Sequence, residues 1–321
     1  MTLLLNRRHF LASSLAAGAT LVCGTGWTFA APFKTTLHKA LIVDKIEEET
    51  LRRYKAAGIE GVECTAWNVG RAEAEKARAL ADKCGMRIHS VLRGWTNFND
   101  PAKLEEDVRS MELALETAQG YGADAVLMVP CKVSGIPMPE AWEFDIEFDP
   151  KTGHVSRVVK GDNAPYAQYI EAQNRATDVS REALKRLIPT AEKCKVVIGV
   201  ENVWSNLWVK PALAAQFVQS FESPWVRFYL DIGNHVKYAK PEEWIQTLGK
   251  LIVKIHIKDF KLNPDGHGGQ FVNIREGSVN WPAVREALDK IGYNGWMTVE
   301  GSDDLSLEEK NKRLDLIAEG K

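Results

Sequence analysis

The chain is poor in residues that several common functional classes require. It has five cysteines in 321 residues and no CxxC pair, so zinc-finger spacing is absent. Its seven histidines are too few for a multi-zinc cluster, and a formal net charge of −2 gives no basic footprint for nucleic acid. No G-x-S-x-G motif supports a serine nucleophile, and no Gly-rich phosphate loop follows the first expected strand. With 45% hydrophobic and 26% charged residues, the composition is that of an ordinary soluble globular protein.

The N-terminus carries the features of an export signal. Residues 6–11 read NRRHFL, a twin-arginine pattern. The apolar run from Leu11 to Cys23 is too short for a permanent bilayer-spanning helix, and small residues near Ala30 suit cleavage. We therefore predict that residues 1–31 are a twin-arginine signal and that the mature protein is periplasmic or secreted, meeting a membrane only through this signal. An uncleaved anchor is the alternative.

After this segment, strand-like and helix-like segments alternate eight times. Expected strands cover 39–43, 59–65, 87–94, 123–130, 196–202, 226–231, 252–259 and 296–300. Expected helices cover 47–58, 71–85, 101–120, a segment ending near Lys195, 211–222, 241–249, 281–290 and 305–319. Eight such units predict an α/β fold, a single-domain (β/α)8 TIM barrel over residues 32–321. A doubly wound open sheet is the main competitor.

One connection is longer than the others. Residues 131–164 are rich in proline, glycine and charge, and they follow the fourth expected strand, on the rim where barrel active sites form. HVSRVVKGDN (154–163) suggests a small hairpin within this insertion. The segment is interpreted either as a lid over the site or as a plain surface insertion.

Four side chains with metal-binding chemistry end the last four expected strands. They are Glu201, Asp231, His256 and Glu300. Parallel strands joined by helices place their C-terminal ends on one face, so the four side chains are expected to converge. Each could instead cap a helix, pair with a lysine or be a structural histidine. Their order on four successive strands favours one divalent cation, and Mn, Mg, Co and Zn all suit this ligand set.

The motifs around these residues resemble a known family. GVEN, YLDIGNH, KIHIKD and TVEGS are similar to the metal-binding strands of the xylose isomerase-like TIM-barrel superfamily, in its sugar phosphate isomerase/epimerase branch with the ketose 3-epimerases. REGSVNW (275–281) resembles the family's Gly-Glu-Gly loop, with Arg275 in place of the first glycine. The resemblance implies that Glu201 and Glu300 are both metal ligands and the catalytic acid/base pair, and that Asp231 and His256 are mainly ligands.

Further residues are candidates for substrate binding. Glu63 and His89 are expected to end the second and third strands, and His89 could instead be a core histidine. His235 follows Asp231 by four positions, whereas the family commonly has a histidine three positions after the aspartate. Lys258 shares the strand face of His256, and Trp204 is expected at the rim.

These observations predict a metal-dependent sugar isomerase or epimerase that abstracts a proton next to a carbonyl. The ketose 3-epimerases carry an arginine shortly after the metal-binding histidine, which this chain lacks, and an exported enzyme rarely meets sugar phosphates. A free sugar or keto-sugar is therefore the expected partner, without nucleic acid, and a homo-oligomer is compatible with the sequence. A 3-keto-glycoside lyase or hydratase with the same metal site, or a non-catalytic periplasmic sugar-binding protein, are the alternatives.

Overall fold

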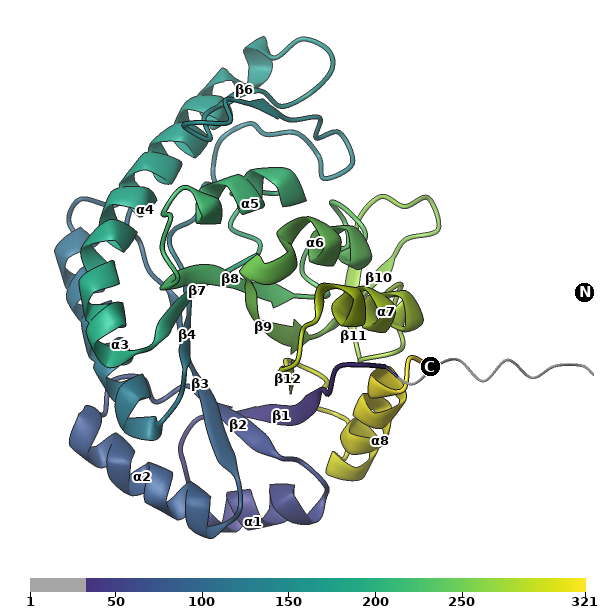
Figure 1. Cartoon of the computed structure of the whole chain (residues 1–321). Coiled ribbons are helices and arrows are strands. Elements are labelled where there is room, and N and C mark those ends of the chain that lie inside the picture. Colours follow the sequence, from purple (N-terminus) through teal and green to yellow (C-terminus); the bar gives the residue numbers. More distant parts are fainter. Residues whose placement is uncertain (1–32) are drawn as a thin grey trace, which may run out of the picture. The chain divides into compact units, whose positions relative to one another are not determined.

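The computed structural model describes residues 33–321, and the expected export signal lies outside them. Eight parallel strands close into a barrel in the order β1–β12–β9–β8–β7–β4–β3–β2 (Figure 1). They are β1 (His38–Val43), β2 (Gly61–Cys64), β3 (Arg87–Trp95), β4 (Ala125–Val129), β7 (Val197–Glu201), β8 (Val226–Asp231), β9 (Ile252–Ile257) and β12 (Trp296–Val299). The predicted (β/α)8 barrel is confirmed, and closure of the sheet excludes the open doubly wound alternative.

Helices surround this ring of strands (Figure 1). They are α1 (Glu48–Ala56), α2 (Arg71–Lys83), α3 (Leu104–Tyr121), α4 (Ala167–Cys194), α5 (Pro211–Gln219), α6 (Pro241–Leu248), α7 (Trp281–Ile291) and α8 (Leu307–Ala318), with short 3-10 helices at Ala164–Tyr166 and Gly249–Leu251. Local chemistry sets their ends. At α7, for example, the Asn280 side chain accepts a hydrogen bond from Ala283 N, and Gly292 takes a left-handed φ of 69° just past the end. Among residues 33–321, no helix has the length and apolar character needed to cross a membrane.

Polar side chains form hydrogen bonds across the inside of the barrel. Tyr229 on β8 donates a hydrogen bond to Glu63 on β2, and His89 on β3 is bonded to Thr298 on β12. These strands are not neighbours in the closed sheet, so the bonds cross its interior. All four side chains are fully buried. A buried polar network of this kind fixes side-chain orientation below the rim.

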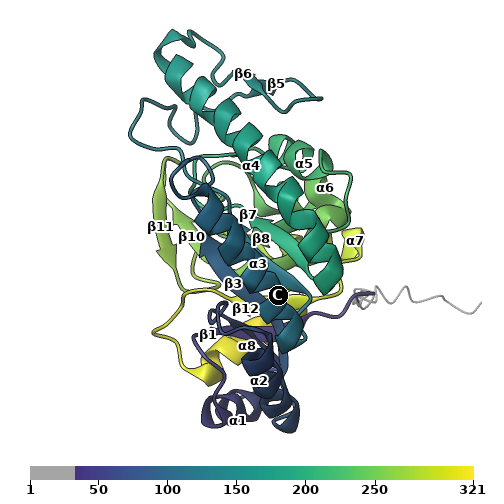
Figure 2. The ribbon, with the colours of Figure 1, turned by 90° about the vertical axis from the view of Figure 1, so that its left-hand side faces the viewer.

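Two hairpins extend the barrel's rim beyond the strands (Figure 2). The first, β5 (Glu147–Phe148) with β6 (Val155–Arg157), lies in the long insertion. It was expected within 154–163 but forms earlier, because Asp149 accepts backbone hydrogen bonds from Lys151 and Thr152 and so closes the turn ahead of β6. The second, β10 (Asp259–Leu262) with β11 (Gly269–Val272), follows β9 and was missed by the sequence analysis.

The long insertion contacts the turn of the β10–β11 hairpin. The ring of Trp142, from the long insertion, stacks on His267, from the β10–β11 turn, with 4.1 Å between ring centroids. Trp142 nevertheless keeps 45% of its surface exposed. The long insertion therefore reaches the hairpin that follows His256, as a lid over the strand ends would require.

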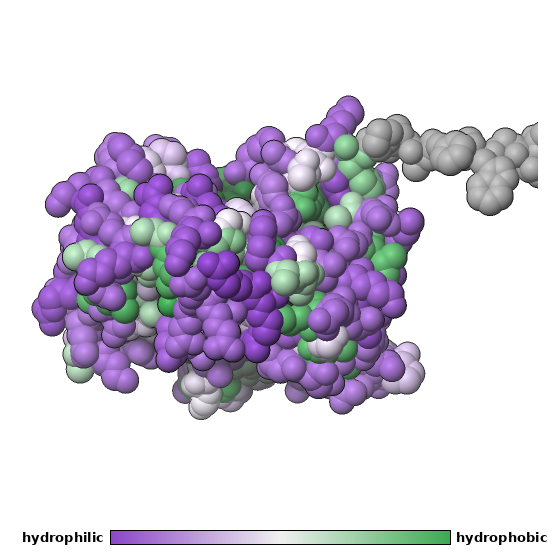
Figure 3. Space-filling view, turned by 90° about the horizontal axis from the view of Figure 1, so that it is seen from below, coloured by the Kyte–Doolittle hydropathy of each residue, from purple (hydrophilic) through white to green (hydrophobic). Residues whose placement is uncertain are grey.

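The cysteines of residues 33–321 are buried and unpaired. Cys64, Cys84, Cys131 and Cys194 are all buried free thiols, so none of these four forms a disulfide. The face seen in Figure 3 is mostly hydrophilic, with apolar residues in small separate spots. This face has no broad apolar patch of the kind that marks an obligate interface.

Candidate metal centre and active site

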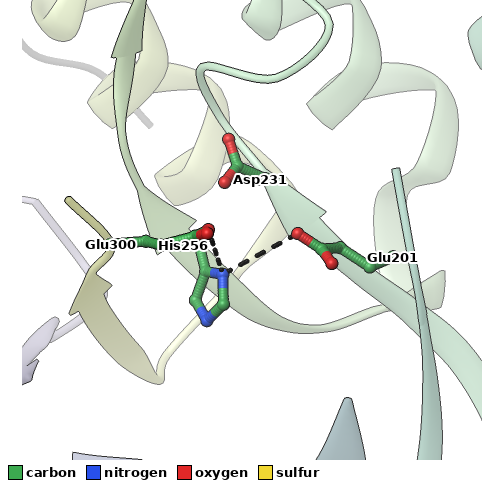
Figure 4. A group of neighbouring side chains, drawn as sticks. All are labelled: Glu201, Asp231, His256 and Glu300. Carbon is green, nitrogen blue, oxygen red and sulfur yellow. Dashed lines mark hydrogen bonds and ion pairs between the residues drawn. The ribbon is translucent and has the colours of Figure 1, made fainter. Parts of the chain in front are cut away.

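The four expected ligands come together at the C-terminal end of the barrel. Glu201 ends β7, Asp231 ends β8, His256 lies near the end of β9, and Glu300 directly follows β12. One ligand atom from each lies within 4.8 Å of all the others. Figure 4 shows one nitrogen of the His256 ring, Nδ1, facing carboxylate oxygens of both Glu201 and Glu300, with the Asp231 carboxylate near the same space. The convergence expected from parallel-strand geometry is thus observed.

Backbone amides hold Asp231 in place. Its Oδ1 accepts hydrogen bonds from the backbone N–H groups of Gly233 at 2.8 Å and Asn234 at 2.7 Å. Gly233 also approaches β9 closely, because a Cβ there would lie 2.8 Å from the Lys258 carbonyl. The other oxygen, Oδ2, is buried without any hydrogen-bond partner. A buried carboxylate oxygen left unpaired is costly, so this atom fits a ligand position.

Asn202 couples the ends of β7 and β8. Its side-chain oxygen accepts a hydrogen bond from Asp231 N at 2.7 Å, and its amide nitrogen donates to Asp231 O at 3.0 Å. Asn234 donates from Nδ2 to Glu201 Oε1 at 3.3 Å. These amides fix the separation of Glu201 and Asp231 without adding charge.

His256 is held between two carboxylates. Its Nε2 lies 2.7 Å from Glu63 Oε2, and its Nδ1 lies 3.0 Å from Glu300 Oε2 and 3.9 Å from Glu201 Oε1. An ionised carboxylate can only accept, so the Nε2 hydrogen belongs to the Glu63 bond and Nδ1 faces the cluster. Tyr229 donates to the same Glu63 oxygen at 2.9 Å. This is the carboxylate–histidine arrangement that orients histidine ligands at metal sites.

Lys258 is the cation nearest the cluster. Its Nζ lies 3.1 Å from Glu300 Oε1, and its side chain is 18% exposed. Burial opposes its charge, but Asp231 and Glu300 outweigh that effect and raise the pKa of Lys258 above its ordinary value. It therefore stays a cation beside Glu300.

The carboxylates crowd negative charge into a buried space. Burial, with a further contribution from the charge of Glu300, raises the pKa of Glu201 to about 8 and that of Asp231 to about 7. Burial also opposes ionisation of Glu300, but the His256 hydrogen bond and the charges of His256 and Lys258 hold its pKa below the usual range. Because their burial disfavours the charged form, Glu201 and Asp231 would be stabilised as carboxylates by a cation bound between them.

The residues therefore fit a divalent cation. Three carboxylates and one imidazole supply oxygen donors and a single nitrogen donor, a set that suits Mg²⁺, Mn²⁺, Co²⁺ or Zn²⁺. Two of the atoms that could coordinate the ion, Asp231 Oδ2 and His256 Nδ1, belong to buried side chains rather than to solvated surface groups. Glu201, Asp231, His256 and Glu300 are the residues that would hold the ion.

An open pocket of about 340 Å³ adjoins the cluster at Glu300. Its walls come from the end of β9, from the strand and loop after the β10–β11 turn, and from the loop after β12. The lining residues are Lys258, Phe271, Val272, Asn273, Glu276, Glu300, Gly301, Ser302 and Asp304. A small polar molecule can therefore reach Glu300 from solvent.

The two histidines expected to bind substrate lie outside this pocket. His89 falls inside β3 rather than at its end, stacks on Trp296 and has no exposed surface. His235 is buried between Tyr238 and Trp244, with Nε2 bonded to Val203 O at 3.1 Å. Both histidines pack in the protein interior, away from the open pocket.

Glu63 also has no exposed surface, and it contacts His256 rather than open space. Lys258 does line the pocket, as expected. Trp204 does not line the pocket but packs behind Phe271, with 5.0 Å between the two ring centroids. Its indole N–H donates a hydrogen bond to Asn234 O. The sequence analysis missed the loop residues Asn273, Ser302 and Asp304 as parts of the site. Ser302 and Asp304 directly follow the last strand, and that position was a usable indication.

The protein is therefore a TIM barrel with a cluster of candidate metal ligands at the C-terminal end of its strands. The family model for the xylose isomerase-like TIM barrel matches residues 51–319. The chain therefore belongs to the xylose isomerase-like TIM-barrel family, which confirms the resemblance seen in the sequence.

Individual relatives are more distant. The chain is 29% identical over 135 residues to L-ribulose-5-phosphate 3-epimerase UlaE of Escherichia coli O1:K1 / APEC, covering 41% of this chain and 45% of that protein. It spans less than two thirds of the length of the curated relatives it matches. Among solved structures, E. coli 3-keto-D-glucoside 4-epimerase YcjR in its apo form has a TM-score of 0.64 at 13% identity, covering 88% of this chain and 98% of that one. The IOLI protein with a zinc atom also gives 0.64, at 16% identity, covering 88% and 96%. At these identities the structural likeness shows the fold.

Proposed function

We propose that the protein is a divalent-metal-dependent sugar isomerase or epimerase that moves a proton at a carbon next to a carbonyl. The observation that supports this most is the convergence of Glu201, Asp231, His256 and Glu300 within 4.8 Å beside an open polar pocket. Family membership and the epimerase name of a curated relative point the same way.

The chain's own groups suit this chemistry. Figure 4 shows Glu201 and Glu300 on opposite sides of the centre, so one carboxylate can take a proton from a bound sugar while the other returns one. Lys258, beside Glu300, can donate a hydrogen bond to a substrate oxygen. A divalent cation bound here would supply a Lewis acid that lowers the energy of the enediolate formed on proton loss.

Solvent-proton exchange tests the proposal. Protein loaded with Mn²⁺ is incubated in D₂O with free ketoses, aldoses and 3-keto-glycosides, and NMR follows deuterium entering at carbon. Wild type should exchange, and Glu201→Gln and Glu300→Gln should each slow exchange by roughly 10²- to 10⁴-fold. Asp303→Asn, an exposed acid outside the pocket lining, is the matched control. Loss of the aglycone instead of stereochemical change would identify a lyase. Binding without any exchange would identify a sugar-binding protein and refute the enzyme.

We further propose that the protein is exported through a twin-arginine signal in residues 1–31, on the evidence of the sequence pattern at Arg7 and Arg8. Replacing both arginines by lysine should leave the protein in the cytoplasm of fractionated cells. Unchanged recovery from the periplasm would contradict this.

A further inference from the structure

We propose that the outer part of the pocket selects a keto-sugar whose far end is uncharged and rich in hydroxyl groups, and that it excludes phosphorylated sugars. This inference rests on the proposed function for the reacting end and adds the substrate class. By outer wall we mean Asn273, Glu276, Ser302 and Asp304, which line the same pocket as Glu300. Glu300 joins this pocket to the four-residue cluster, in which the Oδ2 of Asp231 is buried and has no hydrogen-bond partner.

The outer wall occupies the place where barrels of this kind commonly bind phosphate. Its residues come from the loops after β9 and β12, which are the seventh and eighth strands of the barrel. In many (β/α)8 enzymes these loops, with the N-terminus of a nearby helix, form the phosphate site. Phosphate binding needs free backbone N–H groups at a helix N-terminus, or arginine and lysine side chains.

The nearby helix N-terminus is not free for an anion. Helix α8 begins at Leu307, and the Ser306 side chain already accepts a hydrogen bond from Glu309 N at 3.2 Å. Glu308 and Glu309 occupy its first turn. Their negative charges offset the positive end of the helix dipole, so this helix does not offer the attraction that a phosphate requires.

The charges of the wall are also wrong for phosphate. Lys258 is the only cationic side chain among the nine lining residues, and Glu300 holds it at the inner end. Glu276 is paired with Arg313, whose NH1 lies 2.7 Å from Glu276 Oε1. Asp304 accepts a hydrogen bond from Asn273 Nδ2 at 3.3 Å, and no lysine or arginine in residues 33–321 forms an ion pair with it. The outer wall therefore keeps a net negative charge even when a cation neutralises the inner cluster.

The wall is held in a fixed shape. Buried Asp259 accepts hydrogen bonds from the backbone N–H groups of Arg275, Gly277 and Val279, at 2.9, 3.1 and 3.2 Å. Ser302 Oγ accepts from Ile274 N at 3.0 Å and so ties the two loops together. Both loops are therefore anchored at the backbone, and Asn273 Nδ2 donates to Glu276 Oε2 at 3.4 Å and to Asp304 Oδ2 at 3.3 Å.

The same wall suits sugar hydroxyls. Carboxylate and amide oxygens accept hydrogen bonds from hydroxyl groups, and Asn273 and Ser302 can also donate. Phe271, 42% exposed, offers an apolar face on one side of the pocket. A neutral hydroxyl-rich group, such as the second ring of a keto-glycoside, matches both features, whereas a phosphate would face Asp304 without a cation.

Direct binding measurements test this. Mn²⁺-loaded full-length protein is titrated calorimetrically with a ketopentose, a ketohexose and a 3-keto-glucoside, each beside its terminal phosphate ester. Wild type should bind at least one neutral sugar about tenfold or more tightly than its ester. Asp304→Lys should tighten binding of that ester by about tenfold, the scale of a charge-assisted hydrogen bond. Asp303→Lys adds the same charge next door, outside the lining, and should change it little.

The outcomes separate the two proposals. Equal or tighter binding of the esters by wild type would overturn the subsite, as would equal effects of the two lysine variants. Failure of every sugar to bind a protein with confirmed Mn²⁺ would also overturn it. Selective binding of neutral sugars without proton exchange would support the subsite while refuting the proposed reaction.

Discussion

Replacing Glu63 by glutamine should weaken metal binding although Glu63 is not among the four residues that would hold the ion. The carboxylate is fully buried and lies 2.7 Å from His256 Nε2, so this bond is not screened by water. Glutamine keeps the size but removes the charge. It can accept from Nε2 only by turning its NH₂ group to the other side, where Ser90 Oγ donates to Glu63 Oε1 at 3.4 Å.

The expected loss is about 10- to 100-fold in affinity, the range found for carboxylates that orient metal-binding histidines. This corresponds to about 1.4 to 2.8 kcal/mol. Tyr229→Phe is the matched control. It removes a hydroxyl that bonds the same Glu63 oxygen at 2.9 Å but leaves the carboxylate, so its effect should be smaller.

Calorimetry of Mn²⁺ or Zn²⁺ binding in two buffers with different ionisation enthalpies provides the assay, since it yields affinity and proton release together. Burial opposes protonation of His256, but the charge and hydrogen bond of Glu63, with those of Glu300, raise its pKa well above the ordinary value. Wild type must therefore release a proton to bind a cation, and Glu63→Gln should release fewer. Unchanged affinity together with unchanged proton release would refute the view that Glu63 sets the state of His256.

Three further predictions concern pH and the rim. Burial raises the pKa of Glu201 to about 8 and that of Asp231 to about 7, so protons compete with the cation for these carboxylates. The rise in melting temperature on adding Mn²⁺ should therefore grow from pH 5 to pH 8. A rise that is the same at every pH would contradict this. Burial lowers the pKa of His235 from 6.5 to about 3, so between pH 6.5 and pH 3 the unfolded chain binds a proton on this histidine and the folded chain does not. The free energy of unfolding should therefore fall by about 1.4 kcal/mol for each pH unit as the pH drops through this range. Urea unfolding of His235→Gln should show a shallower pH dependence than wild type. Trp142→Ala removes the stack on His267 and tests whether the long insertion acts as a lid. A lid predicts weaker sugar binding by this variant. Its melting temperature should stay within about 1 °C of wild type, because substitutions at the surface change stability little.

The barrel and its four-residue cluster could be predicted because they depend on local sequence and simple topology. Each strand is a short apolar run, and each cluster residue stands at its C-terminal end, as in VRFYLD ending at Asp231. Once eight βα units are recognised, parallel connection brings those ends to one face. No knowledge of side-chain packing was needed for Glu201, Asp231, His256 and Glu300.

The partners of Glu63 and His89 could not be predicted in this way. Both lie on strands and alternate toward the interior, so their sequence contexts look equally suited to a substrate. Their actual partners, His256 and Thr298, lie on strands across the barrel and far away in the chain. Which interior side chains meet depends on the stagger of the closed sheet, and the β-bulge between Val62 and Glu63 changes that stagger by one residue.

The β10–β11 hairpin was missed for a different reason, and its position decides what the site can bind. Its turn contains Asn-Pro-Asp-Gly at 263–266, a recognisable turn sequence, but its strands were absorbed into the expected end of β9 and a loop. The hairpin places Phe271 and Asn273 beside Glu300, and it presents the loop that holds Glu276. In this fold the strand ends carry the four-residue cluster, whereas the loops after them line the adjoining pocket. The cluster alone therefore could not distinguish a sugar phosphate from a neutral keto-sugar, and the proposed choice between them rests on the acidic wall beyond it.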